Sequence, residues 1–136
     1  STSYGVGFAS WTCDKPEHWV FEGTGMKKGD RVVDLVGWEY HGPPLAEYES
    51  MEVLSSGQVY GWNGEARGRN YATTLYQWTK GNLVFNAGTC WWNMVLSTPP
   101  GFMSPPRRYF KEPDARIQRI TRNVLNRMIA VAPAER

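Results

Sequence analysis

The sequence predicts an α+β domain: a mostly antiparallel or mixed sheet, a short N-terminal helix and a C-terminal amphipathic helix. Three observations predict this class. Short runs of β-branched and aromatic residues alternate with turn residues, a short glycine-containing connector joins two of these runs, and a helical period of apolar residues follows near the C-terminus. The 136 residues suffice for a single domain spanning 1–136.

A short helix that carries residues 18–22 is the first expected element. Asp14 can cap its N-terminus, and Pro16 is tolerated in a first helical turn. The helix should end at Gly23 or Gly25, because a left-handed cap needs a residue without a Cβ.

The first clear strand is expected at residues 31–38, which are rich in β-branched residues. It should end in the segment 39–44, because the pair Pro43 and Pro44 cannot continue a ladder of hydrogen bonds. We therefore expect Glu39 to lie at the C-terminal end of this strand.

A β-hairpin is expected in the second half of the chain, between residues 71–78 and 83–87. The four residues that connect them include a glycine, which is typical of a hairpin turn. Residues 52–60 resemble a strand interrupted at Gly57, and residues 61–68 read as a polar loop.

The clearest helix begins at Pro113 and carries one apolar face. The residues expected to face the core are Ile117, Ile120, Thr121, Val124, Leu125 and Met128. The residues expected to face water are Arg116, Arg119, Asn123, Asn126 and Arg127. A proline-rich loop at 98–106 precedes this helix, and the tail 131–136 should fray.

The charge and hydropathy of the chain exclude several classes of partner. With 15 basic and 13 acidic side chains, the net charge of +2 is too small for binding of a nucleic-acid backbone by charge alone. The basic and aromatic residues at 107–110 have acidic neighbours, so we expect a solvated surface there and no nucleic acid. No run approaches the roughly 18 apolar residues of a membrane span, so no membrane partner is expected.

The two cysteines and the first residue indicate a processed chain from a reducing compartment. Cys13 and Cys90 are too few for a disulfide framework, which favours the cytoplasm, and both are expected to be buried. Neither has a second Cys or a His at metal-ligand spacing. The chain starts at Ser1, so we expect it to be trimmed or cut from a longer polypeptide.

Glu39, followed by Tyr40 and His41, is the most chemically promising cluster. A carboxylate beside aromatic bulk can exchange protons with a substrate, and strand alternation puts Glu39 and His41 on one side. On spacing alone, a solvated or capping role for Glu39 is favoured over catalysis. His18 is expected to be packed or hydrogen-bonded rather than to act as a ligand.

A second candidate is the run of residues 89–93, which consists of Thr89, Cys90, Trp91, Trp92 and Asn93. Its indole faces could wall a binding pocket, or they could seal the core beneath the proline-rich loop. The two alternatives have equal weight from the sequence.

Four segments, in this order, carry a resemblance to a known family. They are HWVFEGTG (18–25) with KGD (28–30), LVGWE (35–39), ATTLY (72–76) with LVFNAGT (83–89), and RITRNVL (119–125). Together they resemble the C-terminal region of the large (beta) subunit of N,N-dimethylformamidase and its relatives. The matched region runs from about residue 14 to residue 129 and so covers nearly the whole chain.

The resemblance implies an amidohydrolase that cuts the C–N bond of a small formamide or related amide. It implies a catalytic domain similar to a glutamine-amidotransferase α/β fold, of which this chain would form the closing part. An iron ion would be held by two tyrosines and a glutamate upstream of the matched region, so its ligands are not in this chain. The expected partners are the rest of the hydrolase polypeptide or another subunit, and the assembly is expected to be oligomeric.

The resemblance also assigns roles to residues. The Gly-aromatic-Glu element of the family falls on Gly37, Trp38 and Glu39, which raises Glu39 to an acid/base candidate. His41, Trp91, Trp92 and Asn93 are the expected substrate-binding residues. Relatives often have an acidic residue where this chain has His41, and the segment 97–113 is unusually long and proline-rich, which leaves the choice of substrate open.

A rival hypothesis from another functional class is a noncatalytic subunit or binding module. It would use a Trp-rich surface against a partner protein or a carbohydrate. The lack of residues at metal-ligand spacing within the chain favours this alternative for the isolated chain.

Overall fold

The computed structural model describes residues 2–79, 81–97 and 112–130, with residues 2–6 described by their backbone alone. The expected proline-rich loop at 98–106, the basic segment at 107–110 and the frayed tail lie outside the described residues.

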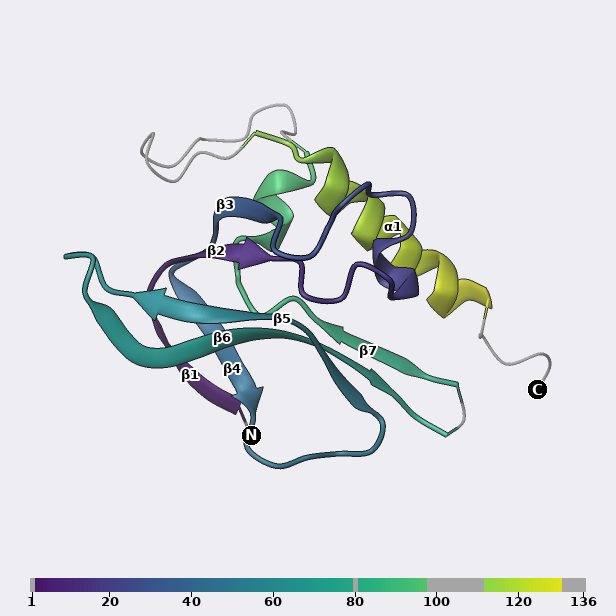
Figure 1. Ribbon diagram of the computed structural model, residues 1–136. Coiled ribbons are helices and arrows are strands. Elements are labelled where there is room, and N and C mark those ends of the chain that lie inside the picture. Colours follow the sequence, from purple (N-terminus) through teal and green to yellow (C-terminus); the bar gives the residue numbers. More distant parts are fainter. Residues whose placement is uncertain (1, 80, 98–111, 131–136) are drawn as a thin grey trace.

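The described strands form three antiparallel sheets, which are accompanied by one long helix (Figure 1). Strand β1 pairs with β4, β2 pairs with β3, and β5, β6 and β7 form a three-stranded sheet in that order. In chain order the elements are β1 Thr2–Val6, β2 Ala9–Thr12, η1 Trp19–Phe21, β3 Arg31–Val36, β4 Glu39–Pro44, β5 Met51–Tyr60, β6 Ala66–Gln77, β7 Leu83–Asn86, η2 Trp92–Val95 and α1 Ala115–Ala130, where η marks a 3₁₀-helix. This arrangement confirms the predicted α+β class.

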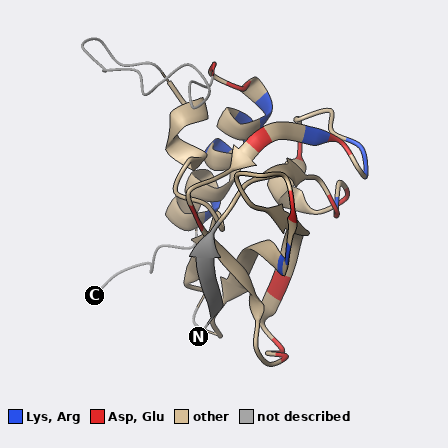
Figure 2. Ribbon diagram, turned by 90° about the vertical axis from the view of Figure 1, so that its left-hand side faces the viewer, with Lys and Arg blue, Asp and Glu red and all other residues tan. Residues whose placement is uncertain are grey.

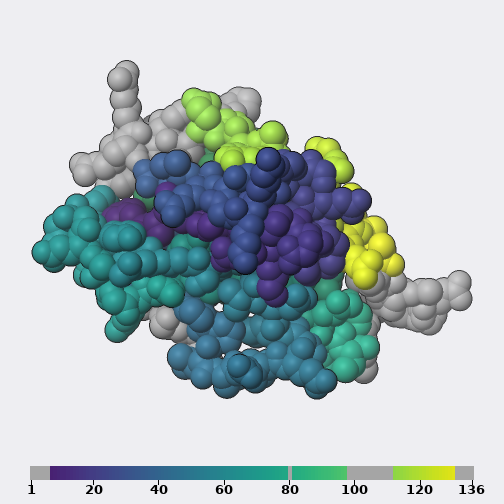
Figure 3. Space-filling model, viewed as in Figure 1, coloured from purple at the N-terminus to yellow at the C-terminus, as the bar shows by residue number. Residues whose placement is uncertain are grey.

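The core lies between helix α1 and the three-stranded sheet. In Figure 1 α1 covers the upper side, β5 and β6 run along the lower side, and β2 and β3 pass between them. Figure 3 shows the same layering, with the N-terminal segments filling the space between helix and sheet. The largest fully buried apolar side chains include Trp11, Tyr40, Tyr71, Leu35, Leu54, Ile117 and Ile120. They come from every layer, so burial of apolar surface holds the layers together.

The segment 39–44 is a strand, which corrects the expectation that its prolines would prevent one. Strand β4 runs from Glu39 to Pro44, and its last residue pairs with Thr2 of β1. Proline is tolerated at the end of a strand in a two-stranded pairing, because the loss of one N–H interrupts few ladder bonds. Glu39 is therefore the first residue of β4, shortly after β3 ends at Val36.

The sequence suggested that Gly57 interrupts this strand, but in the structure Gly57 does not interrupt β5. The strand is continuous, and Gly57 pairs with Tyr71 of β6. A Cβ at Gly57 would lie 2.9 Å from Cε1 of Tyr71, so the glycine makes room for this buried ring. The expected hairpin of β6 and β7 is confirmed, but β6 already starts at Ala66 and shortens the predicted loop.

The N-terminal helix is a single 3₁₀ turn with a different cap from the one expected. His18 caps η1, since its Nδ1 accepts a hydrogen bond from the Val20 N–H at 3.3 Å. Asp14 instead accepts a hydrogen bond from the Ser56 N–H at 2.7 Å and so connects this segment to β5. The expectation that His18 is hydrogen-bonded is confirmed.

Helix α1 confirms the predicted core face in part. Ile117, Ile120 and Val124 are buried, but Leu125 is 53% exposed. On the face expected to be wet, Arg119, Asn126 and Arg127 are exposed as predicted. Asn123 is half-buried against η1, because its Nδ2 donates to Val20 O at 3.0 Å and to Glu22 O at 2.8 Å. Helical periodicity predicts the apolar face but cannot predict which polar face meets a neighbouring segment.

Acidic and basic residues are interspersed along the ribbon in Figure 2. Cys13 is buried as expected, but Cys90 is exposed, and both are free thiols. Within the described part of the chain, none of the helices has the length and apolar character that crossing a membrane requires.

Candidate functional site

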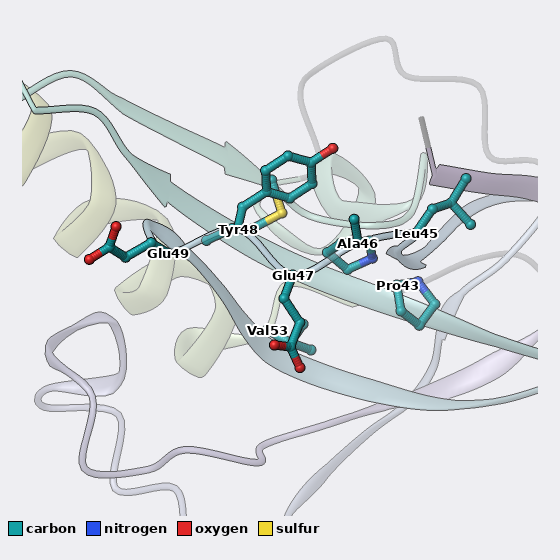
Figure 4. A pocket seen from close by; sticks show the side chains of 9 residues that line it. Pro43, Leu45, Ala46, Glu47, Tyr48, Glu49 and Val53 are labelled. Carbon is teal, nitrogen blue, oxygen red and sulfur yellow. The ribbon is translucent and has the colours of Figure 1, made fainter.

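A hollow of about 780 Å³ lies beneath the connection from β4 to β5 (Figure 4). Its lining is mostly apolar, with the exposed side chains of Leu45 and Tyr48 on the connection. The carboxylates of Glu47 and Glu49 point in different directions. None of the site residues expected from the sequence lines this hollow. Its composition suits a contact surface better than a catalytic centre.

A smaller pocket of about 240 Å³ contains the predicted acid/base residue. Its lining residues are Glu39, Tyr40, His41, Asn86, Thr89 and Cys90. The structure therefore brings Glu39 and His41 together with Tyr40 between them and with Thr89 and Cys90 from the second candidate run. Asn86 is the lining residue that the sequence did not single out. Pockets for drug-sized ligands typically measure about 300–1,000 Å³, so this pocket, which we call the Glu39 pocket, suits a smaller ligand.

Two distant segments form the Glu39 pocket by pairing with each other. Tyr40 forms an antiparallel bridge with Thr89. The His41 N–H donates to Gly88 O at 3.0 Å, and the Cys90 N–H donates to Glu39 O at 3.4 Å. These backbone hydrogen bonds hold the start of β4 against the segment that follows β7.

The turn from β3 to β4 determines how Glu39 is presented. Trp38 has a left-handed backbone conformation, with φ of +63°, and its side chain is 52% exposed. This conformation is unfavourable for a residue with a bulky side chain, so surrounding contacts must maintain it. Gly37 provides such contacts, because its N–H donates to Thr89 Oγ1 at 3.2 Å and its carbonyl accepts from Cys90 Sγ at 3.3 Å.

The Thr89 hydroxyl is a structural group in this pocket. It donates to Leu35 O at 3.2 Å, and it accepts from the N–H of Gly37 at 3.2 Å and of Trp91 at 3.1 Å. One hydroxyl has one donor and two acceptor sites, so these three bonds use its capacity. Thr89 therefore fixes the β3–β4 turn and leaves ligand contacts to its neighbours.

Asn86 connects the end of β7 to His41. The side-chain atoms Nδ2 of Asn86 and Nδ1 of His41 lie 2.9 Å apart, and Oδ1 of Asn86 accepts from the Gly88 N–H at 2.9 Å. Nothing in the sequence indicated that Asn86 would meet a residue of β4.

The tryptophans predicted as a pocket wall pack mainly into the molecule. Trp91 is buried against Gly37, and Trp92 is buried against Trp11 and Phe85 at ring-centroid distances of 5.6 and 5.5 Å. The Trp92 Nε1–H donates to Thr121 Oγ1 at 3.0 Å. Neither indole lines the Glu39 pocket, and the exposed Asn93 does not line it either. Their assignment as substrate-binding residues stays a prediction.

Exposed aromatic rings lie beside the β3–β4 turn. Trp62 contacts Phe8 with ring centroids 4.2 Å apart and meets Trp38 edge-on at 6.4 Å. Trp62 is 51% exposed, close to the value for Trp38. We call Phe8, Trp38 and Trp62 the aromatic patch.

A metal centre does not fit the residues that the structure describes. Among residues 2–79, 81–97 and 112–130 no three His, Cys, Asp or Glu side chains are grouped so that they could hold a metal ion. The Glu39 pocket offers one carboxylate, one imidazole and one thiol without that geometry.

Comparison with known proteins identifies the family. No curated protein matches the chain, and no solved structure does. The family model described as N,N-dimethylformamidase beta subunit-like, C-terminal, matches residues 2–106, which is well over half of the chain. This match confirms the resemblance and covers the first three sequence segments, whereas the fourth, at 119–125, lies outside the matched residues. The chain therefore belongs to the N,N-dimethylformamidase beta subunit-like, C-terminal family.

Proposed function

We propose that this chain is the C-terminal part of an amide hydrolase that cleaves the C–N bond of a small amide. The observation that carries the proposal is the Glu39 pocket, in which a carboxylate and an imidazole line one small hollow. Membership of the dimethylformamidase-like family supports the choice of an amide as substrate. The small volume of the pocket supports a substrate of few atoms.

The chemistry of amide hydrolysis explains the role of each side chain. A carboxylate can accept a proton from an attacking water and return it to the leaving nitrogen, which is general base and then general acid catalysis. We assign that role to Glu39. An imidazole N–H can donate a hydrogen bond to the amide oxygen, and we assign that role to His41. Both residues lie on β4 with one residue between them, so they face the same side of the strand.

The iron implied by the family resemblance would be held by two tyrosines and a glutamate upstream of the matched region. We propose that the rest of the hydrolase polypeptide or another subunit provides them within an oligomeric assembly. The roles of Glu39 and His41 are stated for this chain alone and use no step at the metal. The two free cysteines support a reducing compartment, for which we propose the cytoplasm.

The test is Glu39→Gln in the complete protein that contains this chain. The amide side chain keeps the size of glutamate but cannot transfer the proton, so kcat for hydrolysis of a small formamide should fall by about 10²–10⁴. Glu65→Gln is the matched control, because Glu65 is an exposed glutamate on the β5–β6 loop outside the pocket. Circular dichroism would confirm that both variants fold. An unchanged kcat in Glu39→Gln would overturn the catalytic role.

The second candidate function is a binding module, and the aromatic patch favours it. Half-exposed tryptophans such as Trp38 and Trp62 are typical anchors of contact surfaces. A module of this kind would bind a partner protein or a carbohydrate, without chemistry at Glu39. Unchanged activity in Glu39→Gln, with binding lost in Trp62→Ala, would favour this function over the first.

A further inference from the structure

We propose that Asn86 is a positioning residue that holds neutral His41 in the tautomer with its proton on Nε2. The consequence is that His41 offers a hydrogen-bond donor to whatever occupies the Glu39 pocket. The naming of an amide oxygen as the acceptor rests on the proposed function, but the tautomer does not.

The first step is the orientation of the Asn86 side chain. Oxygen and nitrogen of a side-chain amide look alike, so their positions follow from their partners. The Gly88 N–H can only donate, and it lies 2.9 Å from one end of the Asn86 amide. That end must be the oxygen, Oδ1, and the end directed at His41 must be the nitrogen, Nδ2.

The second step is the proton on His41. An amide nitrogen can only donate, so the ring atom 2.9 Å from it must accept. That atom is Nδ1, and an accepting Nδ1 carries no proton. A neutral imidazole has one proton on its two nitrogens, so the proton of His41 is on Nε2.

The third step is the rigidity of this arrangement. Asn86 pairs with Thr74 at the end of β7, and its Oδ1 closes a turn onto Gly88. Gly88 has φ of +76°, and a Cβ there would lie 2.2 Å from Ala72 O, so the turn lies close against β6. Gly88 O also accepts from the His41 N–H at 3.0 Å. One short turn therefore holds both the backbone and the ring of His41.

The ligand preference follows from the atoms that line the pocket. Nδ1 of His41 is bonded to Asn86, so a polar contact from this ring to a ligand must come from Nε2–H. The Cys90 thiol donates to Gly37 O at 3.3 Å, and the Thr89 hydroxyl is saturated. A ligand that bonds to His41 must therefore present a lone pair, as a carbonyl oxygen does.

The experiment reads the tautomer directly by NMR of the full chain labelled uniformly with ¹⁵N, so that both Asn86 and the histidines carry the label. The chain has two histidines, and His18 is an internal reference because its Nδ1 accepts from the Val20 backbone N–H. At a pH of about 8, above the usual imidazole titration, both rings of the wild type should show a protonated Nε2 and an unprotonated Nδ1. A coupling across the hydrogen bond from Asn86 Nδ2 to His41 Nδ1 should be visible as well.

The deciding variant is Asn86→Asp. A carboxylate can still accept from the Gly88 N–H, but it cannot donate, so only a protonated Nδ1 of His41 can bond to it. We expect the main tautomer of His41 to reverse while His18 stays unchanged. Asn126→Asp, on the exposed side of α1, is the matched control and should leave both rings unchanged.

An Asn86→Asp spectrum in which His41 keeps the wild-type tautomer would overturn the proposal. If this variant does not fold, the wild type decides: a protonated Nδ1 of His41, or no coupling to Asn86, overturns it equally. The tautomer readout needs no substrate, so it stands even if the complete protein hydrolyses no amide. In an active complete protein, Asn86→Asp should lower kcat/KM about tenfold through the lost donor.

Discussion

The replacement of Gly37 by alanine tests how the β3–β4 turn is held. A Cβ at Gly37 would lie 1.9, 2.0 and 2.4 Å from three carbons of the Trp91 ring, closer than real contacts allow. The ring is buried, and both polar backbone groups of Gly37 are hydrogen-bonded, to Thr89 and Cys90. Neither the Trp91 ring nor the Gly37 backbone can move without the loss of a contact, so Gly37→Ala should destabilise the fold.

The magnitude follows from the cost of overpacking. Added atoms in a tightly packed region cost about 1–3 kcal/mol. Gly37 is not among the residues with positive φ, so the backbone itself tolerates alanine, and the cost is steric. If the ring is removed by Trp91→Leu, the same Gly37→Ala change should cost less than about 0.5 kcal/mol, since alanine then lowers the entropy of the unfolded chain. The coupling between the two changes should be about 2 kcal/mol.

Urea unfolding of the four proteins in this double-mutant cycle measures the coupling. With a slope of about 2 kcal/mol per molar urea, 2 kcal/mol shifts the midpoint by about 1 M. Gly25→Ala is the control, because nothing lies within 4 Å of a Cβ there and its φ of +70° gives a cost unrelated to Trp91. A Gly37→Ala cost that is equal with Trp and with Leu at position 91 would refute the steric reasoning.

Two further predictions concern ionisation. Arg116 hydrogen-bonds Asp114 at the start of α1 and holds the pKa of that carboxyl below its usual 3.8. The stabilisation of the fold by this carboxylate is therefore complete above pH 3.8, and it is lost as the pH falls through the lower pKa of Asp114 in the folded chain. Asp114→Asn should therefore cost about 0.5–1 kcal/mol at neutral pH and progressively less in acid, as followed by urea midpoints; a difference independent of pH would contradict this. Burial, with Asp14 and Asp30 nearby, raises the pKa of Cys13 to about 11. Iodoacetamide at a pH of about 8 should therefore label only the exposed Cys90 in the folded chain, but both thiols in urea. The mass of the intact protein measures how many thiols are labelled.

The features that the sequence predicted correctly depend on near neighbours. The β6–β7 hairpin follows from a turn between two strand-like runs, and the buried positions of Ile117, Ile120 and Val124 follow from helical spacing. Strand alternation likewise predicts that Glu39 and His41 share a side, and both line one pocket. The family was also visible in the order of short segments along the chain.

The failures of prediction involve contacts between distant segments. Pro43 and Pro44 argue against a strand locally, yet β4 forms because β1 is available as a partner. Cys90 looks like a core residue by type but lies at the rim of the pocket. Asn123 looks solvated on its helix but donates to the backbone of η1, about a hundred positions earlier in the chain.

The candidate site shows most clearly which features follow from the sequence and which depend on the tertiary structure. The type and order of residues determined by themselves that this chain is an α+β member of a dimethylformamidase-like family with an acid followed two positions later by a histidine. Only the tertiary structure decided that Asn86 would orient this histidine, through the bridge between Tyr40 and Thr89. Turn chemistry and periodicity act over a few residues, whereas the choice of a partner 45 residues away depends on how the whole core packs.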